Sequence, residues 1–347
     1  MSSKTETALE LFLNEHDDEA WRDALAELSH ATHEVDRTAT RIWFYFFPLA
    51  LLRAFEQAED PAKLAQELLM QGKWFLKDQV DSSHTFLYGH RFWPEVKRAV
   101  TRAAEAKETR ATEAKEMHAS RTLAGVVREV ARAVAAERGV DESLAVGISA
   151  VGLMTLQQVG LEEFRRTPGE VLIDRRHARR TPEEILRKRA RDDGQGLFSF
   201  LRTADKRWTI VWDENRDERR FQAVQMQEVA SGAATDKRPW HEVDARCTVN
   251  EGPIPVQCRS ASCGTCWVGV LGGAEKLSET DWRERKMMPL FGYIETSEAR
   301  PLIRLSCQAK AAGAVSVVIP PWNGYFGKYL KRQKEDSTET TSEAVAG

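Results

Sequence analysis

The segment CRSASCGTC, residues 258–266, decides how the second half of this chain folds, because it holds three of the five cysteines among 347 residues. Its cysteines follow the spacing C-x4-C-x2-C, and Cys307 stands in a separate segment, RLSCQAK. Two tetrahedral irons bridged by two sulfides need two terminal thiolates each, and a loop with one distant ligand can supply them on both sides. We therefore predict that Cys258, Cys263, Cys266 and Cys307 hold a [2Fe–2S] cluster.

Five of the six residues between the loop cysteines are small, namely Ser260, Ala261, Ser262, Gly264 and Thr265. They allow backbone N–H groups and hydroxyls to approach the sulfurs, and such hydrogen bonds adjust a reduction potential. The alternatives are a structural zinc site and four unrelated thiols. A zinc site with four cysteines usually has two C-x2-C pairs, whereas this chain has one. The spacing therefore favours an iron–sulfur cluster.

Two segments, IPVQCRSASCGTCWVGVLGG (254–273) and RLSCQAKAAGAVSVVIP (304–320), resemble the plant-type and bacterial [2Fe–2S] ferredoxins. The resemblance covers about residues 207–320. It implies a β-grasp fold, one-electron transfer and the same four cysteine ligands. Family members often have glycine where Ala261 stands, and the stretch before Cys307 is longer here than in the shortest members.

The first half of the chain has the pattern of helices. Apolar residues recur at spacings of three and four from Leu9 to Leu28, and Asp60–Pro61 and Pro94 mark helix starts. The predicted fold class is therefore α+β, with an N-terminal all-α region followed by a C-terminal β-grasp [2Fe–2S] ferredoxin domain. In that domain RWTIVWD (207–213) and RRFQAVQM (219–226) predict a hairpin.

Changes in composition suggest six segments along the chain. The tandem octets TRAAEAKE and TRATEAKE contain no large apolar residue and predict a solvated helical spacer. A later stretch, ESLAVGISAVGLMTLQQVG, is apolar nearly all round and predicts a buried helix. We assign a helical, aromatic-rich domain to 1–100, a charged helical spacer to 101–120, a helical segment that packs on the first to 121–173, a basic linker with a short helix to 174–200, a ferredoxin-like domain to 201–330 and a disordered tail to 331–347.

Several side chains outside the cysteine loop are further candidates for a site. His84 and His90 are candidates for metal or haem ligands, as is the Glu27-x-x-His30 pair with His33, but hydrogen-bonded or solvent-facing histidines are the favoured reading. The fifth cysteine, Cys247, lies on a predicted helix and is interpreted as a small buried hydrophobe. No G-x-G-x-x-G turn occurs, so we expect no flavin or NAD module and predict no catalytic residues.

Composition limits the partners. A net charge of −3 with 42% hydrophobic and 30% charged residues is typical of a globular protein, and we expect no nucleic-acid partner. The start lacks the features of a secretory signal and the run from Ile42 to Leu52 is too short to span a bilayer, so we expect a cytoplasmic protein without a transmembrane span. The aromatic run Trp43–Phe47 is a candidate for core, for a partner interface or for peripheral membrane contact.

The first hypothesis is an electron carrier rather than an enzyme, docked by its helical domain onto a redox protein or a larger oxidoreductase complex. The alternatives are a redox-sensing protein whose helical domain responds to the cluster, and an enzyme with an unrecognised second cofactor. Between Cys266 and Cys307 six acids face six bases, so we expect docking to depend more on shape and apolar contact than on charge. The oligomeric state is left open.

Overall fold

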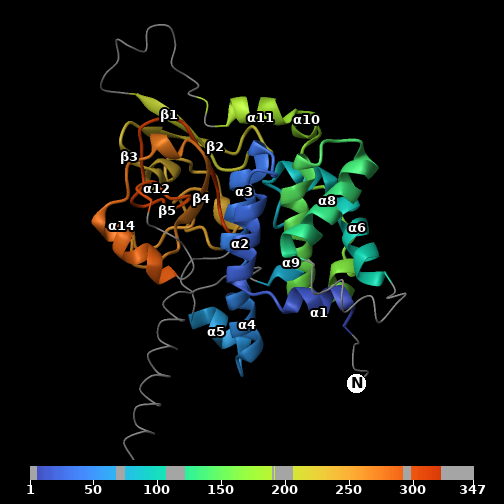
Figure 1. The fold of residues 1–347 in the computed structure, drawn as a ribbon. Helices are drawn as coiled ribbons and strands as arrows, with labels where there is room; N and C mark the ends of the chain where they lie inside the picture. The colour runs from blue at the N-terminus through green and yellow to red at the C-terminus, as the bar shows by residue number, and fades with distance from the viewer. Residues whose placement is uncertain are drawn as a thin grey trace, which may run out of the picture. The chain divides into compact units, whose positions relative to one another are not determined.

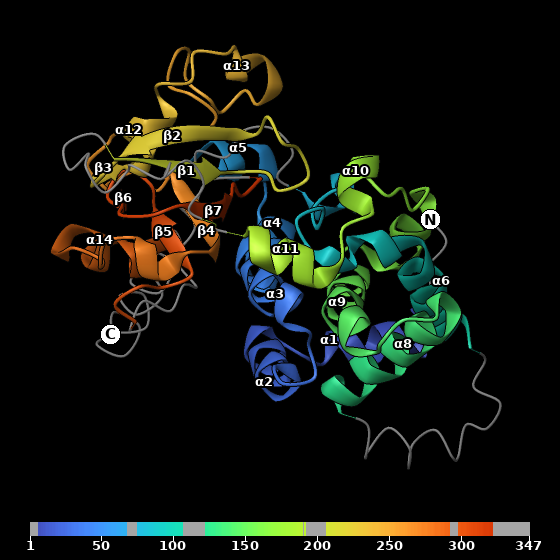
Figure 2. The ribbon, with the colours of Figure 1, turned by 90° about the horizontal axis from the view of Figure 1, so that it is seen from above.

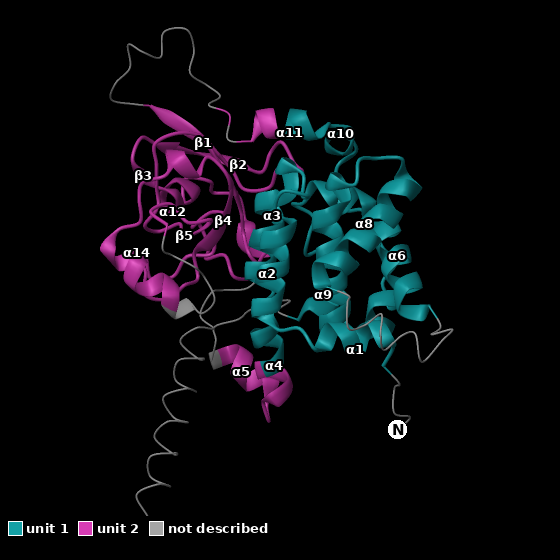
Figure 3. Cartoon of the chain, viewed as in Figure 1, with its two compact units in different colours: residues 1–53, 75–185 teal, residues 54–74, 186–347 magenta. Residues whose placement is uncertain are grey.

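The computed structural model describes residues 6–67, 75–106, 122–189, 191, 206–291 and 298–321. The chain divides into two compact units, residues 1–53 with 75–185 and residues 54–74 with 186–347 (Figure 3). The described part of the first unit is helical, and the second contains a mixed sheet (Figure 1). The α+β class predicted from the sequence is confirmed.

The helices of the first unit surround one central helix, α9 (Ser143–Arg166) (Figures 1 and 2). The segments that pack against it include α1 (Ala8–Asn14), α3 (Glu34–Phe46), α6 (Trp93–Glu105), α8 (Leu123–Arg138) and the short 3-10 helices η1 (Leu76–Asp78) and η2 (Tyr88–Phe92). The other described helices up to residue 188 are α2 (Asp18–Leu28), α4 (Leu49–Gln57), α5 (Pro61–Glu67), α10 (Arg175–Ala178) and α11 (Pro182–Lys188).

Helix α9 is the buried helix that its apolar sequence predicts, since every residue from Ala145 to Leu156 is buried. It is also the described helix that is long and apolar enough to cross a membrane by length and composition, and 67% of its apolar window is buried inside the protein. Gly160 interrupts it with φ 74° and ψ 161°. Beyond this break, Leu161 N–H donates to Glu10 Oε1 at 2.8 Å, so α1 supplies the missing acceptor.

The first residues of the expected solvated spacer, from residue 101, belong to helix α6 and are partly buried. Helix α6 continues to Glu105, and Ala104 in the first octet is buried. Alanine is small enough to fit where helices pack closely, so the absence of large apolar side chains did not mean an exposed face. The second octet, residues 109–116, lies outside the described residues, as does the tail 331–347 that we expected to be disordered.

The sheet of the second unit has five strands in the order β2-β1-β7-β4-β5. Strands β1 and β7 pair in parallel, and the other neighbours pair antiparallel. The strands are β1 (Arg207–Val211), β2 (Arg220–Val224), β4 (Trp267–Gly272), β5 (Ile303–Leu305) and β7 (Val315–Val318), and β3 (Gln227–Glu228) pairs separately with β6 (Lys310–Ala311).

The predicted hairpin is confirmed as β1 and β2, with Ile210 opposite Phe221. The alternating apolar residues of β2 face the core, and the short helix α12 (Val229–Ala233) packs on this strand. Gly232 permits this contact, because a Cβ there would lie 2.9 Å from Cβ of Ala223. A hairpin, a covering helix and a parallel central pair make the β-grasp arrangement.

Three further elements follow in this unit: α13 (Trp240–Val243), the turn η4 (Ala274–Lys276) and α14 (Trp282–Met287), which continues as η5 (Met288–Phe291). The helix predicted around Cys247 is wrong in length, because α13 ends at Val243 and Asp244 has extended backbone angles. Asp244 instead accepts hydrogen bonds from Arg246, a local pairing that competes with helix formation.

The basic segment after residue 174 contains the predicted short helix, α11, which Thr181 and Glu184 cap. Thr181 N–H donates to Glu184 Oε2 at 3.0 Å, and Glu184 N–H donates to Thr181 Oγ1 at 3.2 Å. The segment is not uniformly solvated, since Arg189 is 6% exposed and forms a two-point ion pair with Glu214 in the second unit.

Candidate metal centre

The sheet brings the distant cysteine to the loop. Cys266 directly precedes β4, Cys307 follows β5 after one residue, and the two strands pair with Trp267 opposite Leu305. Because this pair is antiparallel, the start of β4 and the end of β5 lie at the same end of the sheet. Ser306 N–H donates to Cys266 O at 2.9 Å and fixes the two ligand-bearing segments side by side.

The loop itself has an unusual backbone. Arg259, Ala261 and Gly264 all have positive φ, at 51°, 65° and 70°. Left-handed residues at close intervals turn successive N–H groups to one side and form a concave cradle for negative charge. A cluster held by thiolates is negatively charged and suits such a cradle. The small side chains of the loop leave its N–H groups accessible, as the sequence predicts.

Hydrogen-bond donors of the loop and of Gln308 lie close to the cysteine sulfurs. Ser260 N–H lies 3.5 Å from Cys258 Sγ, and the Thr265 hydroxyl donates to Cys263 Sγ at 3.1 Å. The Gln308 side-chain amide is 3.3 Å from Cys307 Sγ and also donates to the Cys307 carbonyl. Donors at these positions stabilise thiolates and adjust the potential of a bound cluster.

Side-chain hydrogen bonds pair Cys258 with Cys263 and Cys266 with Cys307. No group of three or more metal-ligating side chains that could hold a single ion occurs among the residues described. Two pairs suit two irons with two terminal thiolates each better than one zinc ion surrounded by four. All five cysteines are free of disulfides.

Two of the four thiols, Cys258 and Cys307, have lowered pKa values that favour the thiolate. The hydrogen bond from the Cys266 thiol lowers the pKa of Cys307 to about 7, and the same bond raises the pKa of Cys266. Burial raises the pKa of Cys258, but hydrogen bonds from Ser262 and Ser260 outweigh it and bring the value to about 6. Low thiol pKa values favour metal binding, because the thiolate is the ligand.

The two pairs differ in exposure. Cys266 and Cys307 are buried, whereas Cys258 and Cys263 are half-buried. Ser260 and the side chain of Arg259, which pairs with Glu251, lie exposed beside the first pair. The Cys258–Cys263 side of the site is therefore the side open to solvent.

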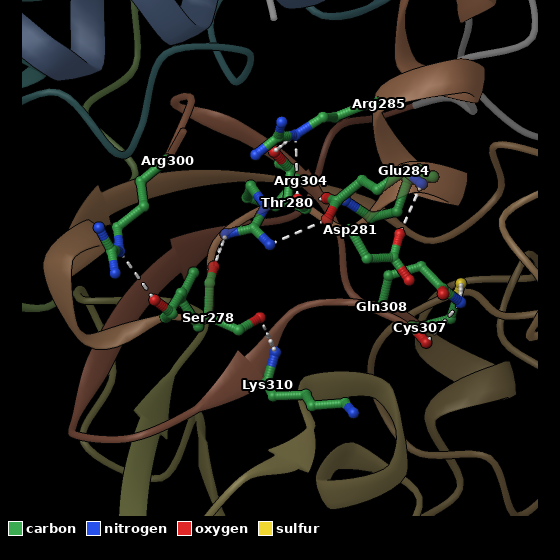
Figure 4. Close-up of polar contacts among 12 residues, drawn as sticks. Ser278, Thr280, Asp281, Glu284, Arg285, Arg300, Arg304, Cys307, Gln308 and Lys310 are labelled. Atoms are coloured by element: carbon green, nitrogen blue, oxygen red, sulfur yellow. Dashed lines mark hydrogen bonds and ion pairs between the residues drawn. The ribbon is translucent and has the colours of Figure 1, made fainter. Parts of the chain in front are cut away.

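A buried ion pair that the sequence analysis missed fixes the strand that leads to Cys307 (Figure 4). Arg304 on β5 and Glu284 on α14 are 1% and 0% exposed, and Glu284 Oε1 also accepts Leu305 N–H at 2.8 Å. Arg304 Nη1 donates to Ser278 O at 2.8 Å. The sequence did contain a signal for this pair: Arg304 lies inside the apolar run LIRL, and a charged residue that is buried in such a strand needs a charged partner.

The candidate histidines form hydrogen bonds with each other and with the backbone. His84 Nε2 lies 3.0 Å from Val80 O, the two Nδ1 atoms of His84 and His90 are 2.8 Å apart, and Leu172 N–H donates to His90 Nε2 at 2.9 Å. This network assigns one proton to each ring, with His90 donating to His84. Both imidazoles are buried and neutral, and their ring nitrogens are hydrogen-bonded, which agrees with the favoured prediction of hydrogen-bonded histidines.

The other candidates are not gathered into a site. Glu27 is exposed and pairs with Arg128 at 3.8 Å, His30 is exposed, and His33 caps α3 through Val35 N–H. Cys247 is buried, as predicted, and its thiol donates to Pro253 O at 3.3 Å.

The aromatic run is mostly core. Trp43, Phe46 and Phe47 are buried, and Phe44 and Tyr45 are half-buried. The Phe44 ring centroid lies 5.2 Å from that of Trp21 in the same unit.

Comparison with known proteins identifies the second unit. A family model described as the 2Fe-2S iron-sulfur cluster binding domain matches residues 243–312, which include all four candidate ligands. The resemblance inferred from the sequence is confirmed, and this domain binds a [2Fe–2S] cluster. No curated protein and no solved structure matches the chain. The assignment of the individual ligands stays a prediction.

Proposed function

We propose that this iron–sulfur protein carries single electrons to or from a larger oxidoreductase. The observation that carries the proposal is the loop of half-exposed Cys258 and Cys263 over the buried pair Cys266 and Cys307. A bound [2Fe–2S] cluster changes charge by one electron when it is reduced. The residues of the chain hold the thiolates, donate hydrogen bonds to sulfur and shield one side from water, so little rearrangement accompanies the transfer.

Iron and sulfide analysis, with electron paramagnetic resonance of the reduced protein, tests this proposal. We expect one cluster per chain and a potential of about −400 mV, typical of all-cysteine plant-type sites. Bound zinc without sulfide would contradict it.

We further propose that the helical unit docks the carrier onto its partner. A tethered carrier acts at an effective concentration that reaches the mM range for short flexible linkers, whereas a free one must diffuse. The helical unit has its own apolar core around α9, and Phe44 and Tyr45 keep part of the aromatic run at the surface. These support a folded docking module with a small aromatic contact.

The test uses the full-length chain purified with its partner. Tyr45→Ser removes a half-buried ring of the run, and Leu11→Ser is the matched control because Leu11 is 52% exposed elsewhere on the helical unit. We expect Tyr45→Ser to lose the partner and Leu11→Ser to retain it. If both variants keep the partner and the transfer rate, docking through this run is wrong. Binding in only one redox state of the cluster would favour the sensing alternative.

A further inference from the structure

Helix α14 presents an aromatic and basic surface to solvent. Trp282 is 69% exposed, more than any other large apolar side chain in the described part of the chain. Arg283, Arg285 and Lys286 are exposed beside it, whereas Glu284 points inward and is buried. A tryptophan among arginines is the composition that dominates binding energy at protein interfaces.

The short helix is held rigidly. Asp281 Oδ1 accepts Glu284 N–H at 2.8 Å and caps the first turn, and the Glu284 carboxylate is bound by Arg304 and Leu305 N–H (Figure 4). The outward side chains therefore start from a fixed backbone. A preorganised surface loses less conformational entropy when a partner binds.

The charges on this surface are uncompensated among the described residues. Arg304 is neutralised by Glu284, and Arg300 lies 3.4 Å from Glu279. No described carboxylate lies within ion-pair distance of Arg283 or Lys286. Arg283 stacks on its neighbour, with the guanidinium 5.4 Å from the Trp282 ring centre. The equal count of six acids and six bases in this region therefore hides a local basic surface.

The same helix is joined to the cluster site. Glu284 Oε1 accepts Leu305 N–H, and Leu305 stands two residues before Cys307. A partner bound to α14 would therefore lie beside the segment that carries a ligand. Electron transfer needs this proximity, whereas a contact elsewhere on the unit would not provide it.

We propose that Trp282, Arg283 and Lys286 form a docking surface for the acidic face of a redox partner protein. The inference rests on the proposed electron-transfer function and names the chemistry of the partner. A lipid surface is the weaker reading, because α14 has six residues and shows one large apolar side chain, too little for an inserted amphipathic helix.

The experiment measures electron delivery from the reduced full-length protein to two haem proteins of opposite charge. Cytochrome b5 is the acidic probe and cytochrome c the basic probe, each followed by stopped flow at low and physiological salt. The variants are Trp282→Ser and the double change Arg283→Gln with Lys286→Gln. The matched control, Arg207→Gln with Arg216→Gln, removes the same charge from β1 and its turn, near the opposite edge of the sheet from β5.

We expect both α14 variants to lower the rate with cytochrome b5 by about tenfold at low salt, and the control to change it less than twofold. The double variant should also lose most of the salt dependence. Unchanged cluster absorbance and electron paramagnetic resonance would show that the fold is intact.

Two outcomes overturn the inference alone. In the first, the wild type reduces both probes but the α14 variants match the control. In the second, only binding to vesicles of phosphatidylserine and phosphatidylcholine is lost in these variants, which identifies a lipid surface. A wild type that reduces neither probe overturns the electron-transfer proposal, and the docking inference falls with it.

Discussion

Arg304 and Glu284 form a two-point ion pair in the interior of the cluster-binding unit, with Nε to Oε1 at 2.8 Å and Nη2 to Oε2 at 2.9 Å. Both side chains are almost completely buried, and their remaining hydrogen bonds go to Ser278 O and Leu305 N–H. Satisfied in this way, the pair joins α14 to the strand that leads to Cys307. Its removal should therefore affect both stability and the cluster.

Glu284→Gln leaves the Arg304 charge buried without a counter-charge. Breaking a buried pair from one side costs about 3–5 kcal/mol, so we expect a loss of this size in urea unfolding and faster release of the cluster. The control is Glu279→Gln, because Glu279 is 59% exposed and pairs with Arg300 at the surface, where such pairs contribute about 0–1 kcal/mol. Equal losses from both substitutions would contradict the structural role of the buried pair.

Gly252 makes the closest backbone approach in the segment before the loop. Its φ is 84°, and a Cβ there would lie 2.0 Å from Ala233 O. Gly252→Ala combines a left-handed backbone penalty of about 1–2 kcal/mol with a clash that α12 must move to relieve. We expect lowered thermal stability and lower cluster occupancy.

Gly139→Ala is the control that separates these two effects. Gly139 has φ 65° at the end of α8, and a Cβ there would meet nothing within 4 Å. Only the backbone penalty applies, so we expect a loss of about 1 kcal/mol and an unchanged cluster. If the two substitutions have equal effects, the contact with Ala233 is unimportant.

The cluster-binding domain could be predicted from the sequence, because cluster ligation imposes a spacing on the cysteines of one short loop. The hairpin and α9 were also readable, since both depend on local patterns of apolar residues. The partner of Arg304 could not be predicted from the sequence, because six acids lie between Cys266 and Cys307. Only the folded structure shows that Glu284 is the one that pairs with Arg304. The contact between His84 and His90 could not be predicted either, because it depends on the irregular turns between them, which leave no periodic pattern of apolar residues in the sequence.

The buried histidine pair should make the helical unit sensitive to acid. Burial lowers the pKa of His90 to about 4 and that of His84 well below its usual value. Asp81 and Arg91 are the charged groups that act on His90, and Lys97 is the one that acts on His84. The folded rings resist protonation, while the unfolded chain takes up protons near pH 6.5. Stability is therefore fully present above about pH 6.5 and is lost as the pH falls toward 4.

For His90 alone the loss is about 3 kcal/mol. Urea unfolding followed by far-ultraviolet circular dichroism at a series of pH values measures it, because that signal reports chiefly on helices. His90→Gln should flatten this pH dependence, whereas His30→Gln, at an exposed position, should leave it unchanged. A wild-type slope that survives His90→Gln would assign the acid sensitivity to other groups.

The fifth cysteine provides the control for the ligand assignment. Burial raises the pKa of Cys247 to about 12, so its thiol stays protonated and donates to Pro253 O. Cys307, in contrast, has its pKa lowered to about 7 by the hydrogen bond from Cys266. Because only a thiolate binds iron, Cys307→Ser should remove or severely weaken the cluster, and Cys247→Ser should leave one cluster per chain.

Iron and sulfide content with electron paramagnetic resonance distinguishes these outcomes. Cys258→Ser, Cys263→Ser and Cys266→Ser should behave like Cys307→Ser, because in each variant one of the two irons keeps one terminal thiolate fewer than it needs. Serine is close to cysteine in size, so a loss confined to these four positions reflects ligation rather than packing. A full cluster in Cys307→Ser, or its loss in Cys247→Ser, would show that a different set of thiols holds the irons.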